Sequence, residues 1–250
     1  MSAPYRPLAD PERGPASMSP QPPRPYPQGG HDPSPLPRGR HRIPAEVVVA
    51  NQRRRLILGA TQALAEHGYA ALTVKHVIEA AGVSRATFYA NFDNKRDCVL
   101  AAHRDAFERL LGLILRACST EREWPFKVKA AIAALFDLAA EAPLEVRLLT
   151  LDALATDMAI AGVMTDSNTH LAALLREGRR HTPLGPLMPD LTEEALIGAV
   201  SAVLGGHLLD GGVKDLAELQ PEVLQLLLTP YVGAPEAARV ATGSRFGAAP

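Results

Sequence analysis

The side chains with the clearest chemical purpose lie in one short run, residues 84–89 (Ser-Arg-Ala-Thr-Phe-Tyr). The guanidinium of Arg85 could form two parallel hydrogen bonds to the O6 and N7 atoms of a guanine. Ser84 is a good N-cap, and the amino end of a helix that begins there would favour a nearby phosphate. The run therefore predicts a short helix whose exposed beginning can meet bases and phosphates. The side chains expected there are Ser84, Arg85, Ala86, Thr87 and Tyr89.

A second helix stands directly before this run. Thr73 is a suitable N-cap for it, and Gly82 interrupts it. Its apolar residues recur at the spacing of one buried helical face: Val74, Val77, Ile78 and Ala81. Two short helices joined by a three-residue turn that contains glycine form a helix-turn-helix unit, whose second helix enters the major groove of DNA. On these residues alone, an ordinary corner between two helices of a bundle stays open as an alternative.

Neighbouring helices must hold this unit in place. An upstream helix is expected to end at Gly68, and Asn94 can cap a long downstream helix that runs from Lys95 to about Cys118. The upstream helix has one apolar face: Ile57, Ala60, Thr61 and Leu64. The residues expected to fix the angle within the unit are Val77, Ile78, Val83 and Phe88.

The charge along the chain is divided in a way that the net charge of −1 conceals. Residues 38–96 carry ten Lys or Arg against four Asp or Glu, whereas residues 97–250 carry thirteen against twenty. A basic segment joined to an acidic remainder is typical of a protein that binds nucleic acid through one domain and has a separate second domain.

The first 44 residues differ in composition from the rest of the chain. They contain thirteen prolines and few large apolar residues, so we expect this extension to be disordered. It ends in a basic cluster made of Arg38, Arg40 and Arg42. The cluster could be a solvated linker, or an arm that lies against phosphates or in a minor groove. The sequence leaves both interpretations open.

The remainder of the chain predicts helices and no strands. Ala- and Leu-rich stretches of helical length recur, without the alternating runs of β-branched residues that indicate strands. We therefore expect an all-α fold, with residues 233–250 as a flexible tail. Further helices are expected at residues 124–141, 144–155, 158–181, 192–210 and 221–231.

Catalysis, metal binding and membrane insertion have no support in the sequence. No G-x-S-x-G, H-E-x-x-H or phosphate-loop motif occurs. Cys98 and Cys118 lack the spacing of metal ligands, and His76 has no second ligand at a suitable spacing. No apolar run is long enough to span a bilayer. We expect a cytoplasmic protein with reduced thiols that is not an enzyme and uses no cofactor.

Residues 53–100 as a unit closely resemble the N-terminal domain of the TetR family of regulators. The matching features are Ile57, Ala60, Leu64, Gly68-Tyr69, Leu72-Thr73-Val74, Ile78, Ala81-Gly82-Val83-Ser84, Thr87-Phe88-Tyr89, Phe92 and Lys95. The resemblance implies that Thr73, Tyr89 and Lys95 contact phosphates. The residues that it places facing the groove are Ser84, Arg85, Ala86 and Thr87. Contacts at Ala90 and Asn91 are doubtful, because the family often has His or an aromatic residue there.

The same resemblance implies a division into a DNA-binding domain, residues 45–94, and a helical ligand-binding and dimerisation domain, residues 95–232. Its last two helices, 192–210 and 221–231, would pair with their copies in a second subunit. Small residues on the first of them favour close approach of another helix: Gly198, Ala202, Gly205 and Gly206. A two-fold dimer would place two reading helices about one DNA turn apart on a near-palindromic operator.

A ligand cavity among the middle helices, closed by the helix at residue 192, is also implied. The scarcity of aromatic and charged residues there favours an apolar small molecule. Each residue expected to line the cavity also fits a plain core position: Phe107, Leu111, Phe136, Leu148, Met164, Leu171, Leu174 and His207.

The leading interpretation is a ligand-responsive transcriptional repressor that binds double-stranded operator DNA as a homodimer. Two alternatives remain. One is a DNA-bound dimer that answers to a protein partner and has no small-molecule ligand. The other is an all-α enzyme or small-molecule carrier whose N-terminal corner has no role on DNA.

Overall fold

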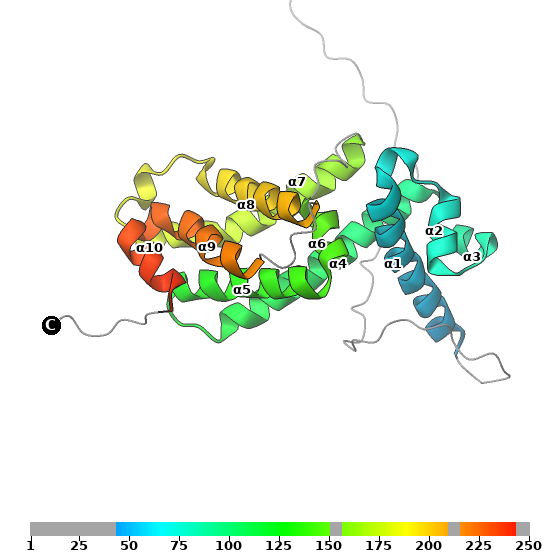
Figure 1. The fold of residues 1–250 in the computed structure, drawn as a ribbon, viewed down its shortest axis with the longest axis horizontal. Coiled ribbons are helices and arrows are strands. Elements are labelled where there is room, and N and C mark those ends of the chain that lie inside the picture. Colours follow the sequence, from blue (N-terminus) through cyan, green and yellow to red (C-terminus); the bar gives the residue numbers. More distant parts are fainter. Residues whose placement is uncertain (1–43, 151–156, 210–215, 244–250) are drawn as a thin grey trace, which may run out of the picture. The chain divides into compact units, whose positions relative to one another are not determined.

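The computed structural model describes residues 44–150, 157–209 and 216–243, and over these residues it contains helices and no strand, as expected (Figure 1). The prediction of an all-α fold is confirmed. The α-helices are α1 (Ala45–Ala71), α2 (Val74–Ala81), α3 (Arg85–Tyr89), α4 (Lys95–Ser119), α5 (Trp124–Glu141), α6 (Pro143–Thr150), α7 (Met158–Leu175), α8 (Thr192–Leu209), α9 (Leu216–Val232) and α10 (Ala234–Ala241). Two 3₁₀ helices, η2 (Arg176–His181) and η3 (Gly185–Leu187), lie between α7 and α8.

Helices α1 to α3 and the first half of α4 surround one hydrophobic core, which we call the head core. Phe88 of α3 and Val77 of α2 are completely buried in it. Helices α1 and α2 cross closely at Gly59, where a Cβ atom would lie 2.7 Å from the backbone nitrogen of Ala81. A larger side chain at Gly59 would push α2 away, so the glycine sets the separation of the two helices.

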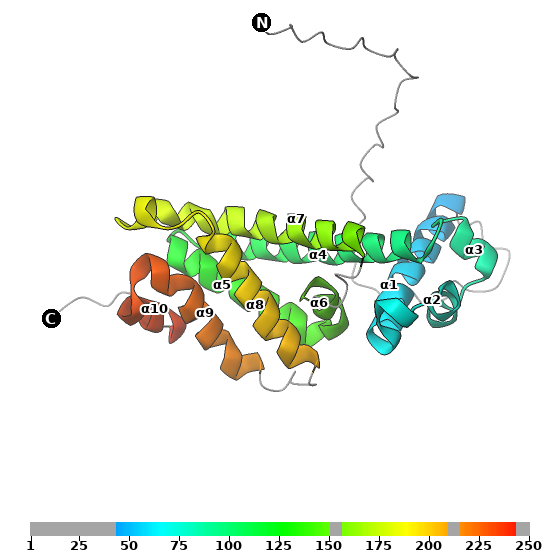
Figure 2. The same cartoon turned by 90° about the horizontal axis from the view of Figure 1, so that it is seen from above.

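The second core, the body core, lies among the remainder of α4 and helices α5 to α10. Two long helices contribute to both cores. In α4, Ala102 is buried in the head core and Leu110 in the body core. In α7, Ile160 belongs to the head core and Leu175 to the body core. Figure 2 shows α7 alongside α4, with which it is in contact. These two helices therefore connect the cores.

A buried carboxylate ties the far end of the body together. Glu193, in the first turn of α8, is completely buried and accepts hydrogen bonds from Arg179, Arg176 and the hydroxyl of Tyr231. Burial alone would raise the pKa of Glu193, but the hydrogen bonds from Arg179 and Tyr231 outweigh it, and the pKa falls to about 2. The ionised cluster joins α8 to α9 and η2.

The helices agree with the sequence expectations in most places and differ in three. The helix expected over 158–181 stops at Leu175 and tightens into η2, because Gly178 packs directly against the ring of Trp124. Helix α9 begins at Leu216, five residues earlier than expected, since Leu216 and Leu219 are buried. The part of the 144–155 helix beyond residue 150 lies outside the described residues.

The third difference concerns the expected flexible tail. Residues 234–241 form α10, whose Ala237 and Val240 are buried in the body core. The ammonium group of Lys129 donates a hydrogen bond to the carbonyl of Val240, at 2.7 Å. The prediction of a tail was wrong here because small residues that look unsuited to a core are enough for a helix that lies tightly on α9. Residues 244–250 lie outside the described residues.

Candidate nucleic-acid interface and apolar cavity

Side-chain caps begin each of the three helices that follow α1. The Thr73 hydroxyl accepts a hydrogen bond from the His76 N–H at 3.3 Å, and the Ser84 hydroxyl accepts one from the Thr87 N–H at 3.0 Å. Asn94 caps α4 in the same way. All three caps were expected from the sequence, and each satisfies an amide that a helix leaves unpaired at its start.

The turn between α2 and α3 is fixed from both sides. Gly82 adopts the left-handed conformation, with φ 60° and ψ 38°, which a residue with a Cβ atom enters only at a cost. The guanidinium of Arg55, on α1, donates to the Gly82 carbonyl at 2.7 Å. Val83 is half-buried rather than fully buried. The orientation of α3 is therefore set by α1 as well as by the turn itself.

The N-terminal end of α3 is exposed, as the sequence predicted. Ser84, Arg85 and Ala86 are exposed, while Thr87 is half-buried and its hydroxyl lies 2.9 Å from that of Ser84. Tyr89 is also exposed, but it is the last residue of α3 and does not lie at the beginning of the helix, where it was expected from the sequence. The guanidinium of Arg85 lies 5.8 Å from the centre of the Tyr89 ring and forms no ion pair or hydrogen bond with any described residue. Its five N–H donors are therefore free to meet a ligand.

Lys95 makes contacts within the head that the sequence did not indicate. Its ammonium group donates hydrogen bonds to the carbonyls of Tyr69 and Leu72, at 3.0 and 2.8 Å, and lies over the Tyr69 ring. An ammonium group has three donors, so one is left for a phosphate. Lys95 thus holds the end of α1 against α4. The basic cluster at residues 38–42 lies outside the described residues.

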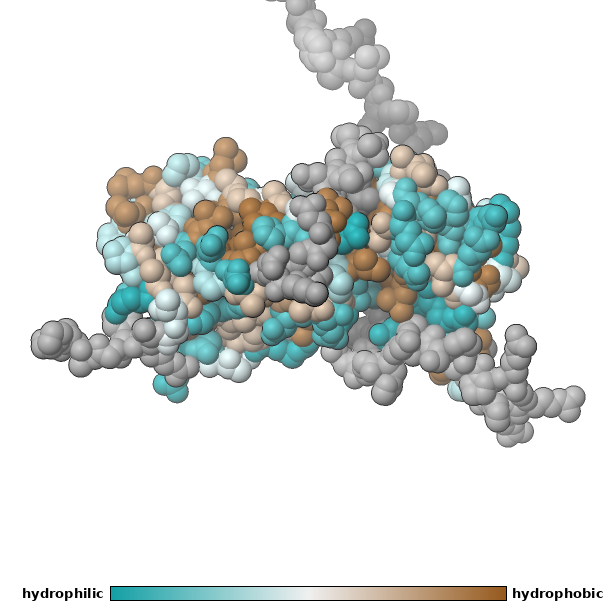
Figure 3. Space-filling view, viewed as in Figure 1, coloured by the Kyte–Doolittle hydropathy of each residue, from teal (hydrophilic) through white to brown (hydrophobic). Residues whose placement is uncertain are grey.

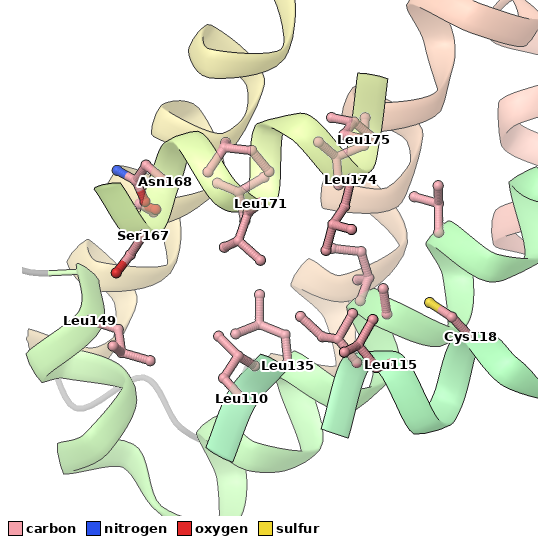
Figure 4. Close-up of a pocket in the computed structure, with 18 of the residues that line it drawn as sticks. Leu110, Leu115, Cys118, Leu135, Leu149, Ser167, Asn168, Leu171, Leu174 and Leu175 are labelled. Carbon is pink, nitrogen blue, oxygen red and sulfur yellow. The ribbon is translucent and has the colours of Figure 1, made fainter. Parts of the chain in front are cut away.

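An apolar cavity of about 390 Å³ lies in the body, between α4 and α5 on one side and α7 and α8 on the other (Figure 4). Phe107, Leu171 and Leu174 line it, as expected. The other five residues expected there do not: Leu111, Phe136, Leu148, Met164 and His207. Leu148 and Met164 belong to the head core, and the ring of His207 is held at the carbonyl of Val203 on its own helix.

Polar side chains interrupt the apolar lining of the cavity at several points. Ser167 and Asn168 of α7 are at one end and Cys118 of α4 is toward the other (Figure 4). Burial raises the pKa of the Cys118 thiol. Trp124 and Lys127 also line the cavity, and no pattern in the sequence indicated them, because only the packing of α5 against α4 brings them there.

Comparison with known proteins identifies the N-terminal part. Residues 56–102 match the family model described as bacterial regulatory proteins of the tetR family. This segment has the sequence of a TetR-family N-terminal domain. The match covers α2, α3 and the start of α4, where the caps and the exposed Arg85 lie.

Curated relatives match only part of the chain. The transcriptional repressor AcnR of Corynebacterium glutamicum is 34% identical over 64 residues, which are 26% of this chain and 34% of AcnR. The similarity thus spans about a third of that relative's length.

Solved structures extend the similarity of fold to the body. The fatty acid degradation regulator FadR of Bacillus halodurans superposes with a TM-score of 0.62 at 24% identity, over 71% of this chain and 94% of that one. FadR of Bacillus subtilis in complex with stearoyl-CoA superposes with a TM-score of 0.52 at 18% identity, over 72% and 98%. Both comparisons concern the fold alone.

Two observations on the described residues concern membrane insertion and metal binding. None of the helices that the structure describes is long and apolar enough to cross a membrane. In the same part of the chain, no three side chains of His, Cys, Asp or Glu come together as ligands for a metal ion.

Proposed function

We propose that this protein is a transcriptional repressor that binds a near-palindromic operator as a homodimer and responds to an apolar effector. The observation that carries the DNA-binding part is the exposed N-terminal end of α3. Arg85 stands there on a helix whose position is fixed by the Ser84 cap, the Gly82 turn and Arg55. A rigid helix with free guanidinium donors at its exposed end fits recognition of base edges in a major groove.

The positions of the predicted phosphate contacts support this proposal. Thr73 lies at the amino end of α2, where unpaired N–H groups favour an anion. Tyr89 is the exposed last residue of α3, so a phosphate contact there would come from its hydroxyl. Lys95 keeps one donor for a phosphate. Ser84 and Thr87 are engaged with one another, so we propose that they mainly orient α3, and that Arg85 reads the base.

The dimer is proposed to form through α8. One face of this helix carries small and apolar residues that no other described residue covers: Ala195, Ala202, Val203, Gly206 and Leu209. Space is open beyond Gly198 and Gly206, whereas Gly205 faces Thr150 of α6 within the chain. Figure 3 shows apolar side chains gathered over α8. Such a face permits close helix packing with a second copy.

Helix α9 is a weaker part of that interface than the sequence suggested. Its apolar side chains lie in the body core, against α5 and α10, so they need no second subunit. The outward face of α9 keeps Leu226 exposed beside the polar residues Glu222 and Thr229. We therefore propose that α8 supplies most of the buried apolar area between subunits, with Leu226 at its side.

The effector is proposed to be a molecule with a long apolar part. Most of the side chains that line the cavity are aliphatic, and FadR of Bacillus subtilis, which has the same fold, was solved with stearoyl-CoA. An acyl chain would bury its surface without leaving polar groups unpaired. A cavity of this size favours an effector-binding regulator over one that answers only to a protein partner.

Selection of bound duplexes from a random DNA pool tests the proposed function. We expect a recovered motif with two inverted half-sites about 10 base pairs apart, bound less tightly as salt is raised. Light scattering at low micromolar concentration should give the mass of a dimer. Recovery of unrelated sequences would contradict a specific operator, and a monomer under those conditions would contradict the dimer.

The effector is tested separately with stearoyl-CoA added to the complex of the protein and the selected duplex. We expect release of the DNA, with an apparent affinity reduced about 5- to 150-fold. The matched control is coenzyme A without the acyl chain, which should leave the affinity unchanged. Tighter binding with the acylated form would indicate an activator.

A further inference from the structure

Asp157 lies at the junction between the two cores and is in contact with both. Its carboxylate accepts a hydrogen bond from the Tyr69 hydroxyl at 2.9 Å and another from the Arg96 guanidinium at 2.6 Å, both at the same oxygen. The second oxygen accepts the N–H of Ala159, at 3.0 Å, and so caps α7. Asp157 is only 9% exposed.

The two partners of this carboxylate belong to the head. Tyr69 follows the kink of α1 at Gly68, directly before the Thr73 cap of α2. Arg96 lies in the first turn of α4, beside Lys95. Lys95 binds the carbonyl of the same Tyr69. A displacement of the Asp157 carboxylate would therefore act on the end of α1 and the start of α4 together.

The other end of α7 forms a wall of the cavity. Asn168, Leu171 and Leu174 line the cavity, and they lie on the same continuous helix that Asp157 caps. A helix transmits axial or tilting motion along its length because its hydrogen bonds are internal. An effector that shifts this wall would thus move the carboxylate at the beginning of α7.

We propose that Asp157 is the positioning residue that transmits occupancy of the cavity to the DNA-reading head, through its bonds to Tyr69 and Arg96. The inference rests on the proposed function, because it assumes that the cavity binds an effector and the head binds DNA. It adds a route that begins at α7, distinct from the continuity of α4 between the two cores.

The chemistry of the junction makes the contact between Asp157 and Arg96 sensitive to a displacement of α7. Burial alone would raise the pKa of Asp157, but the hydrogen bonds from Arg96, Tyr69 and Ala159 outweigh it and hold the pKa below its usual value. The carboxylate thus stays ionised. Charge-assisted hydrogen bonds of this length depend steeply on geometry. A shift of α7 would therefore weaken the contact to Arg96.

The cavity can be filled by a covalent label even though the natural effector is not known. Cys118 lines the cavity, whereas Cys98 is completely buried and its pKa is raised to about 12 by that burial. Dodecyl methanethiosulfonate at pH 9 should place a twelve-carbon chain on Cys118 alone: the thiolate attacks the sulfenyl sulfur, a disulfide forms and methanesulfinate leaves. Mass spectrometry gives the extent of labelling, and Cys118→Ser serves as the unlabelled control.

The test compares the DNA affinity of labelled and unlabelled protein, on the selected duplex, for the wild type and for variants of the junction. Asp157→Asn keeps a good N-cap for α7 but removes the charge that holds Arg96. Tyr69→Phe removes one hydroxyl and little volume. Arg96→Ala is matched by Arg104→Ala, an exposed arginine on α4 with no hydrogen bond or ion pair to a described residue.

In the wild type, labelling should change the affinity at least 5-fold. In Asp157→Asn and Arg96→Ala the change should fall below about 2-fold, while Arg104→Ala behaves like the wild type. A change as large in both junction variants and in Tyr69→Phe as in the wild type would overturn the role of Asp157 and leave the proposed function standing. No change in the labelled wild type would contradict the effector response itself, and the Asp157 route with it.

Discussion

The interactions that stabilise the head differ from those that stabilise the body. In the head, side chains cap the helices from within a few residues of sequence: Thr73, Ser84 and Asn94 each bond an amide three residues on. In the body, α5 and α10 have no side-chain cap. Contacts across long stretches of sequence secure the body instead, such as Glu193 with Tyr231 and Lys129 with Val240.

The difference shows which part of the molecule must be rigid by itself. A helix that reads DNA needs one defined orientation, and local caps and a glycine turn supply it whatever the body does. In the proposed function the walls of the cavity respond to an effector, and contacts distant in sequence secure them, such as that of Glu193 on α8 with Tyr231 on α9. Helices α4, α6 and α7, together with Asp157, connect the head and the body in the part of the chain that the structure describes.

The largest effect is expected from the head core. Phe88→Ala removes a completely buried ring and should lower the stability of the head by about 3–5 kcal/mol. Hydrogen exchange should then show loss of protection in α1 to α3 while amides of α5 and α9 keep theirs, and DNA binding should be lost. Phe136→Ala, in the body core, should give the reverse pattern. Equal loss in both regions from either variant would mean that head and body unfold as one unit.

The body should be the part that is sensitive to acid through Glu193. Its pKa is about 2 in the folded protein against an ordinary value of 4.5, so the unfolded chain takes up the proton first as the pH falls. The stability from this group is complete above pH 4.5 and is lost between pH 4.5 and about 2. Glu193→Gln should lower the Tm at neutral pH by about 5 °C and make the Tm less dependent on pH in that range. An unchanged pH profile in the variant would show that other groups cause the acid sensitivity.

Replacement of Lys95 tests whether its hydrogen bonds stabilise the head or whether its charge acts only in DNA binding. Lys95→Met keeps the length of the side chain but loses the bonds to the Tyr69 and Leu72 carbonyls, and should cost about 1–3 kcal/mol of stability. The exposed Lys75→Met is the matched control and should cost almost nothing. Weaker binding to all DNA sequences in Lys95→Met without loss of stability would assign Lys95 to phosphate contact alone.

The smallest effect is expected from a single cap. Ser84→Ala should lower stability by about 1 kcal/mol and weaken operator binding, because α3 loses the bond that begins it. Ser119→Ala, at the end of α4, removes a hydroxyl that caps no helix start and should have little effect on either quantity. Loss of DNA affinity in Ser84→Ala with full stability would show that Ser84 contacts the DNA directly.

The same contrast explains how much of the fold and of the candidate site could be predicted from the sequence. The ends of α2, α3 and α4 follow from Thr73, Gly82, Ser84 and Asn94, because the interactions that define them are local. The exposure of Arg85 follows from the helical period. In this region the sequence alone was sufficient to place the candidate site.

Much less of the body could be predicted from the sequence. Asp157 lies 88 residues from Tyr69 and 61 from Arg96 in sequence, so no pattern along the chain could join them. Helix α10 was missed because its buried residues, Ala237 and Val240, are too small to stand out. The cavity residues that the sequence did find, such as Phe107 and Leu171, came from a family resemblance and not from a local signal.

The most direct test of the account is the discrimination of one base by Arg85. Affinities are measured at fixed salt for the selected duplex and for the same duplex with the critical guanine pair replaced. The wild type should prefer the original by about 10- to 100-fold, and Arg85→Ala should bind both duplexes almost equally. If Arg85→Ala weakens both duplexes by the same factor and keeps the preference, α3 does not read the base through Arg85, and the central claim is wrong.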